Sequence, residues 1–228
     1  ILKNRIFCII LIKTIVSNTS KHLSLAIIVL GAGCFFLSNI LLKEILTEIE
    51  YGQYSIVVTY FSMIFIFGIL GMEQIFLRYS NAIADNTIET QKFQVLLIIR
   101  TIFVTSTIST LFFKFYFDGQ FSVNPIILYL SSISMVAMLY LFNIFRLNSD
   151  FVFAQFLSNF WRLILLVFAV VFLLLRITDL NLLLNLIMLG IIAIFVFGVF
   201  IFFKRIHFVY NQNHAPKDIV RTSFQFFI

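Results

Sequence analysis

The fold is decided by residues 37–82, LSNILLKEILTEIEYGQYSIVVTYFSMIFIFGILGMEQIFLRYSNA. It joins two long apolar segments through a short acidic turn that ends in Tyr51-Gly52-Gln53-Tyr54, and it leaves the second segment through Arg78-Tyr79. Within the turn, Thr47 and Glu50 fit a capping box at the start of a helix. An acidic turn at one end and a basic exit at the other predict a hairpin of two helices that cross a membrane with a defined direction.

The composition of the whole chain supports a membrane protein. Of the 228 residues, 61% are hydrophobic and 11% are charged, and the mean hydropathy is +1.07. A soluble domain of this length has too much surface to hide so large an apolar fraction. The pattern lacks the alternating ten-residue segments of a membrane barrel. The fold class predicted is therefore an all-α integral membrane protein.

Six segments are long enough to cross a bilayer core, which takes about 20 apolar residues per helix. The predicted spans are 22–46, 54–77, 93–117, 125–145, 152–175 and 181–203. Short connections between them indicate antiparallel neighbours. Residues 22–203 are thus predicted to form a six-helix transmembrane bundle.

The distribution of basic residues predicts the orientation, because cytoplasmic segments are enriched in Lys and Arg. With the N-terminus inside, the cytoplasmic segments carry Lys3, Arg5, Lys13, Lys21, Arg78, Lys92, Arg146, Lys204, Arg205, Lys217 and Arg221. The outer segments carry Lys43, Lys114 and Arg176. Both ends of the chain are therefore predicted to be cytoplasmic, and the net charge of +6 is assigned to this bias and to attraction for anionic membrane lipids rather than nucleic acid.

The two ends of the chain lie outside the predicted bundle. Residues 1–21 are expected to be a cytoplasmic or interfacial amphipathic segment, with a signal anchor as the alternative. Residues 204–228 are expected to be a cytoplasmic linker followed by the start of a truncated seventh helix. Because the chain begins at Ile1 and ends in this apolar run, we expect one half of a two-bundle transporter.

The fifth span carries the most informative polar residues. Gln155, Ser158, Asn159 and Arg162 share one helical face, and Arg162 lies about 15 Å deep, near the midplane. A guanidinium without a partner there costs from about 3 to over 10 kcal/mol. Either Arg162 lines a polar cavity and contacts an anionic substrate, or it is buried in a pair with Glu73 or against carbonyl groups of neighbouring helices.

Two further charged residues are weaker candidates. Arg100, about 11 Å deep in the third span, either lines the same cavity or extends to the headgroups. Glu73 is a candidate for ion coupling, although it can equally pair with Arg78 or Arg100. The hydroxyl residues around Arg100 are assigned to helix packing, and Gly68 and Gly71 to close approach or bending of the second span.

No catalytic constellation is apparent. His22, His207 and His214 flank the spans, and Cys8 and Cys34 are in apolar surroundings typical of small buried hydrophobes. Neither a metal-ligand spacing nor a phosphate-binding Gly-rich loop is present. We therefore expect no enzyme activity, cofactor or metal.

The first two spans resemble those of polysaccharide transporters, the Wzx-type O-antigen flippases. The matching residues are Leu41-Leu42, Glu50-Tyr51-Gly52-Gln53-Tyr54, Gly71-Met72-Glu73 and Arg78-Tyr79. Thr47-Glu48 and Glu44 depart from the pattern, where Gly-Pro and a basic residue are common.

This resemblance implies a function at the bacterial inner membrane. The complete protein would have two bundles and would flip an undecaprenyl-pyrophosphate-linked oligosaccharide by alternating access, with membrane lipids, a polysaccharide polymerase and a chain-length regulator as partners. Arg162 would contact the anion, Gln155 and Asn159 would bond sugar or phosphate, and Arg100 would be a second contact. The alternatives are an ion-coupled multidrug antiporter of the same superfamily and a membrane enzyme of the glycan pathway, such as a polymerase or acyltransferase.

Overall fold

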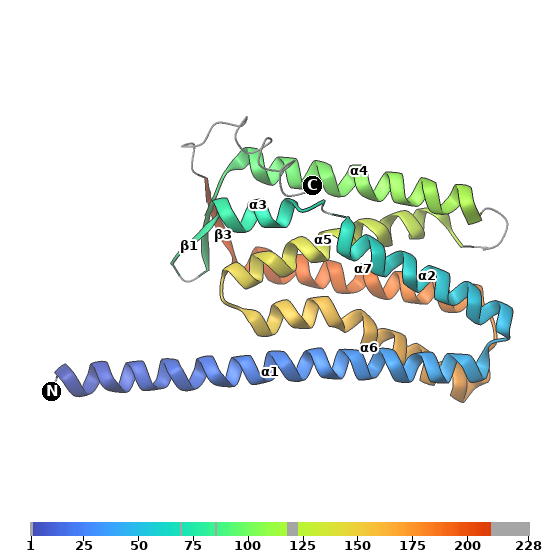
Figure 1. The fold of residues 1–228 in the computed structure, drawn as a ribbon, viewed down its shortest axis with the longest axis horizontal. Helices are drawn as coiled ribbons and strands as arrows, with labels where there is room; N and C mark the ends of the chain where they lie inside the picture. Colours follow the sequence, from blue (N-terminus) through green and yellow to red (C-terminus); the bar gives the residue numbers. More distant parts are fainter. Residues whose placement is uncertain (1, 69, 85, 118–122, 211–228) are drawn as a thin grey trace.

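The computed structural model describes residues 2–68, 70–84, 86–117 and 123–210. Within them the chain forms helices and one small sheet (Figure 1). The helices are α1 (Leu2–Ile45), α2 (Glu48–Phe67), α3 (Met72–Tyr79), α4 (Lys92–Phe117), α5 (Pro125–Leu147), α6 (Phe151–Leu175) and α7 (Leu180–Arg205). The strands are β1 (Asn81–Ala84), β2 (Thr87–Thr90) and β3 (His207–Tyr210).

In the part of the chain that the structure describes, six helical segments are long and apolar enough to cross a membrane, which confirms the predicted class of multi-pass helical membrane protein. They run Lys21–Ile45, Glu48–Tyr79, Lys92–Phe117, Pro125–Leu147, Phe151–Leu175 and Leu180–Arg205. The second begins six residues before the predicted start at 54, because the capping box forms and starts α2 at Glu48. Thr47 Oγ1 accepts from the Glu50 N–H, and the Glu50 side chain accepts from the Thr47 N–H at 3.0 Å.

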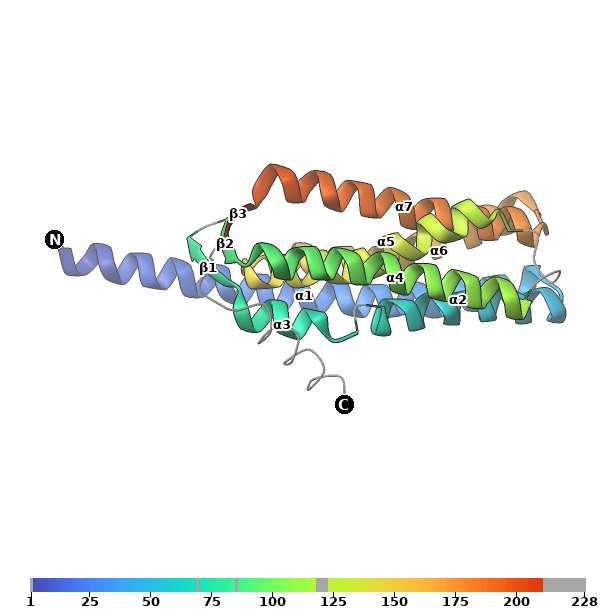
Figure 2. The ribbon, with the colours of Figure 1, turned by 90° about the horizontal axis from the view of Figure 1, so that it is seen from above.

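The first helix continues far beyond the bundle. α1 has 44 residues and is therefore about 66 Å long, roughly twice the thickness of a bilayer core. Its N-terminal part projects past the other helices in both views (Figures 1 and 2). Residues 2–20, within the predicted separate segment 1–21, are thus continuous with the first span, and contact of this part with the membrane surface stays a prediction.

α5 is the central helix. It packs against α2, α4, α6 and α7, whereas α1 lies at the periphery and packs mainly along α6. α5 accordingly has a long buried face that includes Met135, Met138 and Phe145, all fully buried. Buried serines on this helix donate to carbonyl groups of their own helix, as Ser132 does to Leu128 at 2.8 Å. Such bonds satisfy the serine hydroxyl groups within their own helix.

The second span is broken near Gly68 and Gly71, the glycines that were expected to allow either close approach or bending. Leu70 and Gly71 both have left-handed backbone angles, with φ of 54° and 74°. The break frees the Gly68 carbonyl, and Thr105 of α4 donates to it at 2.6 Å. A Cβ on Gly68 would lie 2.5 Å from Val136 of α5, so the chain can approach α5 this closely only with glycine.

A three-stranded sheet lies at the end of the bundle predicted to be cytoplasmic. β1 and β2 form an antiparallel hairpin, and β3 pairs with β2 in parallel, with Thr87 opposite His207 and Thr90 opposite Tyr210. Within the segment 204–228, predicted to begin with a cytoplasmic linker, Lys204 and Arg205 end α7 and His207–Tyr210 form β3. The predicted start of a seventh helix lies outside the described residues.

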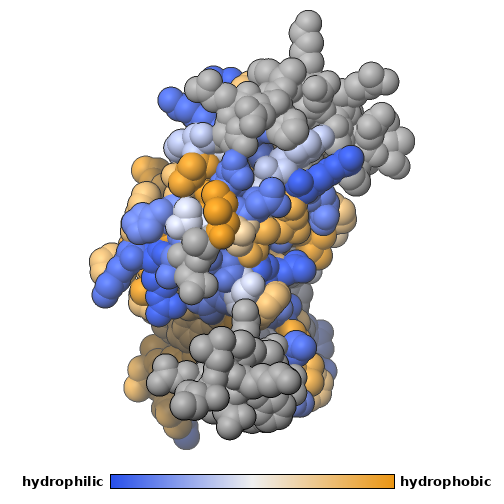
Figure 3. Space-filling view, turned by 90° about the vertical axis from the view of Figure 1, so that its left-hand side faces the viewer, coloured by the Kyte–Doolittle hydropathy of each residue, from blue (hydrophilic) through white to orange (hydrophobic). Residues whose placement is uncertain are grey.

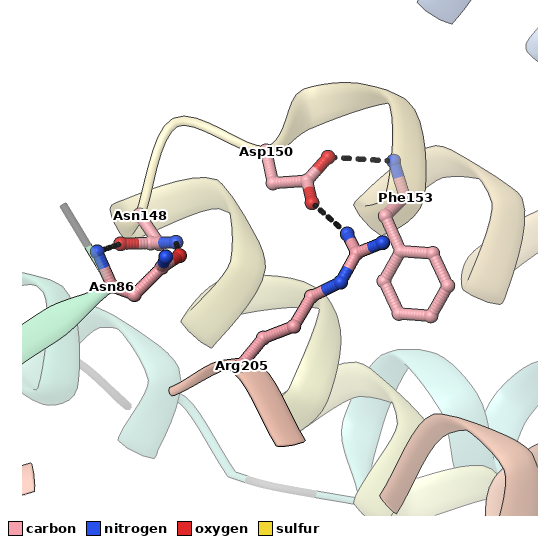
Figure 4. Close-up of polar contacts among 5 residues, drawn as sticks. All are labelled: Asn86, Asn148, Asp150, Phe153 and Arg205. Atoms are coloured by element: carbon pink, nitrogen blue, oxygen red, sulfur yellow. Dashed lines mark hydrogen bonds and ion pairs between the residues drawn. The ribbon is translucent and has the colours of Figure 1, made fainter. Parts of the chain in front are cut away.

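Two side-chain contacts join the connections at this end (Figure 4). Asn148, after α5, donates to Asn86 Oδ1 at 3.0 Å and accepts from the Asn86 N–H at 3.1 Å. Asp150 caps α6 through the Phe153 N–H and accepts from Arg205 of α7 at 3.2 Å. Figure 3 shows hydrophilic residues over this end of the molecule, as expected at a water boundary.

Candidate functional site

The predicted polar face of the fifth span forms a hydrogen-bonded ladder on α6. Asn159 Nδ2 donates to the Gln155 carbonyl at 3.0 Å and to Ser158 Oγ at 2.9 Å. Asn159 Oδ1 accepts from Arg162 Nη1 at 2.9 Å. Gln155 Oε1 also accepts from Asn159 Nδ2 at 3.3 Å, so both side chains are engaged with their own helix, and Asn159 fixes the position of the guanidinium group.

The ladder lies against α1. Asn159 is 7% exposed, and a Cβ built on Gly31 of α1 would lie 2.9 Å from both its Cβ and its Oδ1. Beside this contact, Phe35 of α1 packs edge-on against Trp161, with ring centroids 6.1 Å apart. The absence of a side chain at Gly31 is thus what allows an amide to stand between the two helices.

Arg162 is half-buried and has no carboxylate partner in the part of the chain that the structure describes. Its contacts there are the Asn159 amide and the ring of Trp161, whose centroid lies 5.7 Å from the guanidinium carbon. Arg205 and Asp150 form an ion pair at one end of the bundle, away from Arg162. The alternative pair of Arg162 with Glu73, which belongs to α3, is not formed among the described residues.

An apolar cavity of about 200 Å³ opens between α1 and α6 beside the ladder. Asn159 is part of its wall and accepts a hydrogen bond from Arg162, which does not itself line the cavity. We call this cavity the α1–α6 crevice; its walls include Leu30, Gly31 and Cys34 of α1 and Asn159, Phe160 and Leu163 of α6. A polar ladder with a cation therefore borders an apolar space at the same depth.

Arg100 and Glu73 do not join this group. Arg100 is exposed on α4, which packs mainly on α5, and it has no hydrogen bond or ion pair with a described residue. Glu73 is partly buried in the first turn of α3 and likewise forms no ion pair within the described residues, so the predicted pairs with Arg78 and Arg100 are not seen. Thr101 near Arg100 donates to the Leu97 carbonyl, in line with the packing role predicted for the hydroxyl residues.

Two members of the site were missed by sequence reasoning. Gly31 leaves the space that Asn159 occupies between α1 and α6. Trp161 provides the aromatic ring next to Arg162. The Gly31-x-Gly33 pair in the first span was the available signal, since small residues mark close contacts between membrane helices.

Comparison with known protein families, curated proteins and solved structures finds no match for this chain. Among the described residues, no group of three or more His, Cys, Asp and Glu side chains is placed to hold a metal ion. The class of multi-pass helical membrane protein therefore rests on the chain's own sequence and structure, and the family stays a prediction.

Proposed function

We propose that this chain is one bundle of a Wzx-type flippase. The substrate is an undecaprenyl-pyrophosphate-linked oligosaccharide, carried across the bacterial inner membrane by alternating access with the N-terminus inside. The observation that carries the proposal is the half-buried guanidinium of Arg162, bonded at 2.9 Å to Asn159 and without a carboxylate partner among the described residues.

A cation held in this way favours an anionic ligand. Arg162 is the twelfth residue of α6 and lies about 17 Å from its start, near the middle of a bilayer core. A charge at that depth needs a partner, water or a ligand. A pyrophosphate supplies oxygen acceptors that match the planar fork of guanidinium donors.

The other members of the ladder have a positioning role in this proposal. Because the Asn159 amide is bonded on both sides, it holds the guanidinium group rather than offering free donors to a sugar. Gln155 and Ser158 in turn hold Asn159. The anion contact is therefore assigned to Arg162 alone.

The test is complementation of a bacterial strain that lacks its own O-unit flippase. Wild type, Arg162→Ala and Arg162→Lys are expressed from the complete gene at matched membrane levels, and surface polysaccharide is measured. Arg146→Ala is the matched control, since Arg146 is an exposed arginine at the end of α5 that packs on Phe142.

We expect wild type and Arg146→Ala to restore surface polysaccharide and Arg162→Ala to fail. Arg162→Lys should restore it in part, because lysine keeps the charge but loses the bidentate fork. Failure of wild type with several matched sugar pathways would overturn the flippase proposal. Full rescue by Arg162→Ala would overturn the assignment of the anion contact.

A further inference from the structure

The α1–α6 crevice has the size and the walls of a site for part of an apolar chain. Its volume of about 200 Å³ is below the range of about 300–1,000 Å³ typical of pockets that enclose a whole drug-sized ligand. Its walls are apolar side chains except at Asn159, whose amide is already bonded within α6. An occupant therefore need not supply hydrogen bonds, and a sugar would find too few in return.

The crevice also lies at mid-membrane depth. Gly31 is ten residues from Lys21 and about 15 Å from that end of the span, and Asn159 is eight residues and about 12 Å from Phe151. Leu30 and Leu163 on its walls are 65% and 40% exposed, so the crevice opens at the outer surface of the described bundle. A lipid chain can enter it without crossing the bundle.

The neighbouring charge restricts the kind of lipid. The Arg162 guanidinium is bonded to the same Asn159 that lines the crevice, so a cation and an apolar space adjoin one amide. A neutral lipid leaves the cation without a partner, and a free anion leaves the crevice empty. A phospholipid at rest has its phosphate at the membrane surface, about 15 Å away from this depth.

The ligand that satisfies both features is a phosphate ester of a long apolar alcohol, with its phosphate in the middle of the membrane. We infer that the α1–α6 crevice binds the first part of a polyprenyl chain while the attached phosphate lies on Arg162. This inference rests on the proposed function, in which such a phosphate must pass through the bilayer core, and it names the part of the carrier lipid that α1 and α6 recognise.

The test uses a cysteine that the chain already carries in the crevice. Cys34 is a free thiol in the crevice wall, and Cys8 is the second cysteine of the sequence. The complete protein carrying Cys8→Ser and no cysteine other than Cys34 is placed in nanodiscs of phosphatidylcholine. The rate of Cys34 labelling by a membrane-permeant maleimide is then measured with and without added lipid.

Four probes separate the contributions of chain and charge: polyprenyl phosphate, polyprenol, inorganic phosphate and phosphatidylglycerol. Polyprenyl phosphate at about ten times its dissociation constant should slow labelling about tenfold, since about one crevice in ten then stays open. The other three should leave the rate nearly unchanged. Equal protection by polyprenol or by phosphatidylglycerol, or no protection by polyprenyl phosphate, overturns the inference.

Two variants test the two halves of the site. Arg162→Gln should abolish protection by polyprenyl phosphate, and Leu163→Trp, a substitution at a partly exposed wall residue, should do so by filling the crevice with Arg162 intact. Protection that persists in both variants refutes the assignment. Binding of polyprenyl phosphate without rescue in the complementation assay would refute the flippase proposal and leave this site standing. Rescue without binding would refute this site and leave the flippase proposal standing.

Discussion

A single methyl group at Gly31 should weaken the contact between α1 and α6. In Gly31→Ala the new Cβ would meet Asn159 Cβ and Oδ1, each at 2.9 Å, which is closer than real Cβ contacts. Asn159 cannot move freely, because its amide bonds to both Ser158 and Arg162. Overpacking of this kind typically costs about 1–3 kcal/mol.

Gly33→Ala is the matched control, since a Cβ at Gly33 meets no atom within 4 Å. Both glycines lie in α1, so the gain of up to about 1 kcal/mol in helix propensity is common to both variants and cancels in their difference. Thermal unfolding in detergent should place Gly31→Ala below Gly33→Ala by roughly 2–4 °C for each kcal/mol. Equal unfolding temperatures, or a more stable Gly31→Ala, would refute the reasoning.

Two other substitutions test contacts elsewhere in the bundle. Asp150→Asn keeps an N-cap acceptor but loses the exposed ion pair with Arg205, so it should lower the free energy of unfolding by less than about 1 kcal/mol. Asp150→Ala also loses the cap, so in denaturant unfolding it should lower that free energy by about 0.5–2 kcal/mol more. An Asn variant as unstable as the Ala variant would contradict this order. Thr105→Val leaves the Gly68 carbonyl without its donor and should destabilise by about 0.6–1.7 kcal/mol in the same assay. Thr101→Val, which removes only a bond back to its own helix, should cost less, and the opposite ranking would exclude a stabilising role for the Thr105 bond.

The spans were predictable because hydropathy and length alone identify a helix that crosses a membrane. The third was predicted at 93–117 and forms at Lys92–Phe117. The capping box of Thr47 and Glu50 was also predictable, since it is a pattern within one turn. The ladder from Gln155 to Arg162 belongs to the same category, because its spacing lies within one helix.

The remaining features depend on how distant segments meet. The contact of Asn159 with Gly31 depends on which face of α1 packs against α6. A helix that is apolar all round gives little signal for which of its faces turns inward. The left-handed angle at Leu70 is unfavourable for leucine, so the local sequence does not predict it. The separation of Arg100 from Arg162 likewise follows from packing around α5, which the sequence does not encode locally.

The parallel pairing of β3 with β2 imposes an order on synthesis. Strands in parallel cannot be joined by a tight hairpin, and here four helices are made between Thr90 and His207. While those helices are being made, the hairpin of β1 and β2 has an unpaired edge that is open to other chains and to chaperones. The sheet is completed only when α7 has been made and its end has returned to the same side of the bundle. Protection from hydrogen exchange of those β2 amides that face β3 rather than β1 would therefore date the moment at which a nascent chain has placed all of these helices.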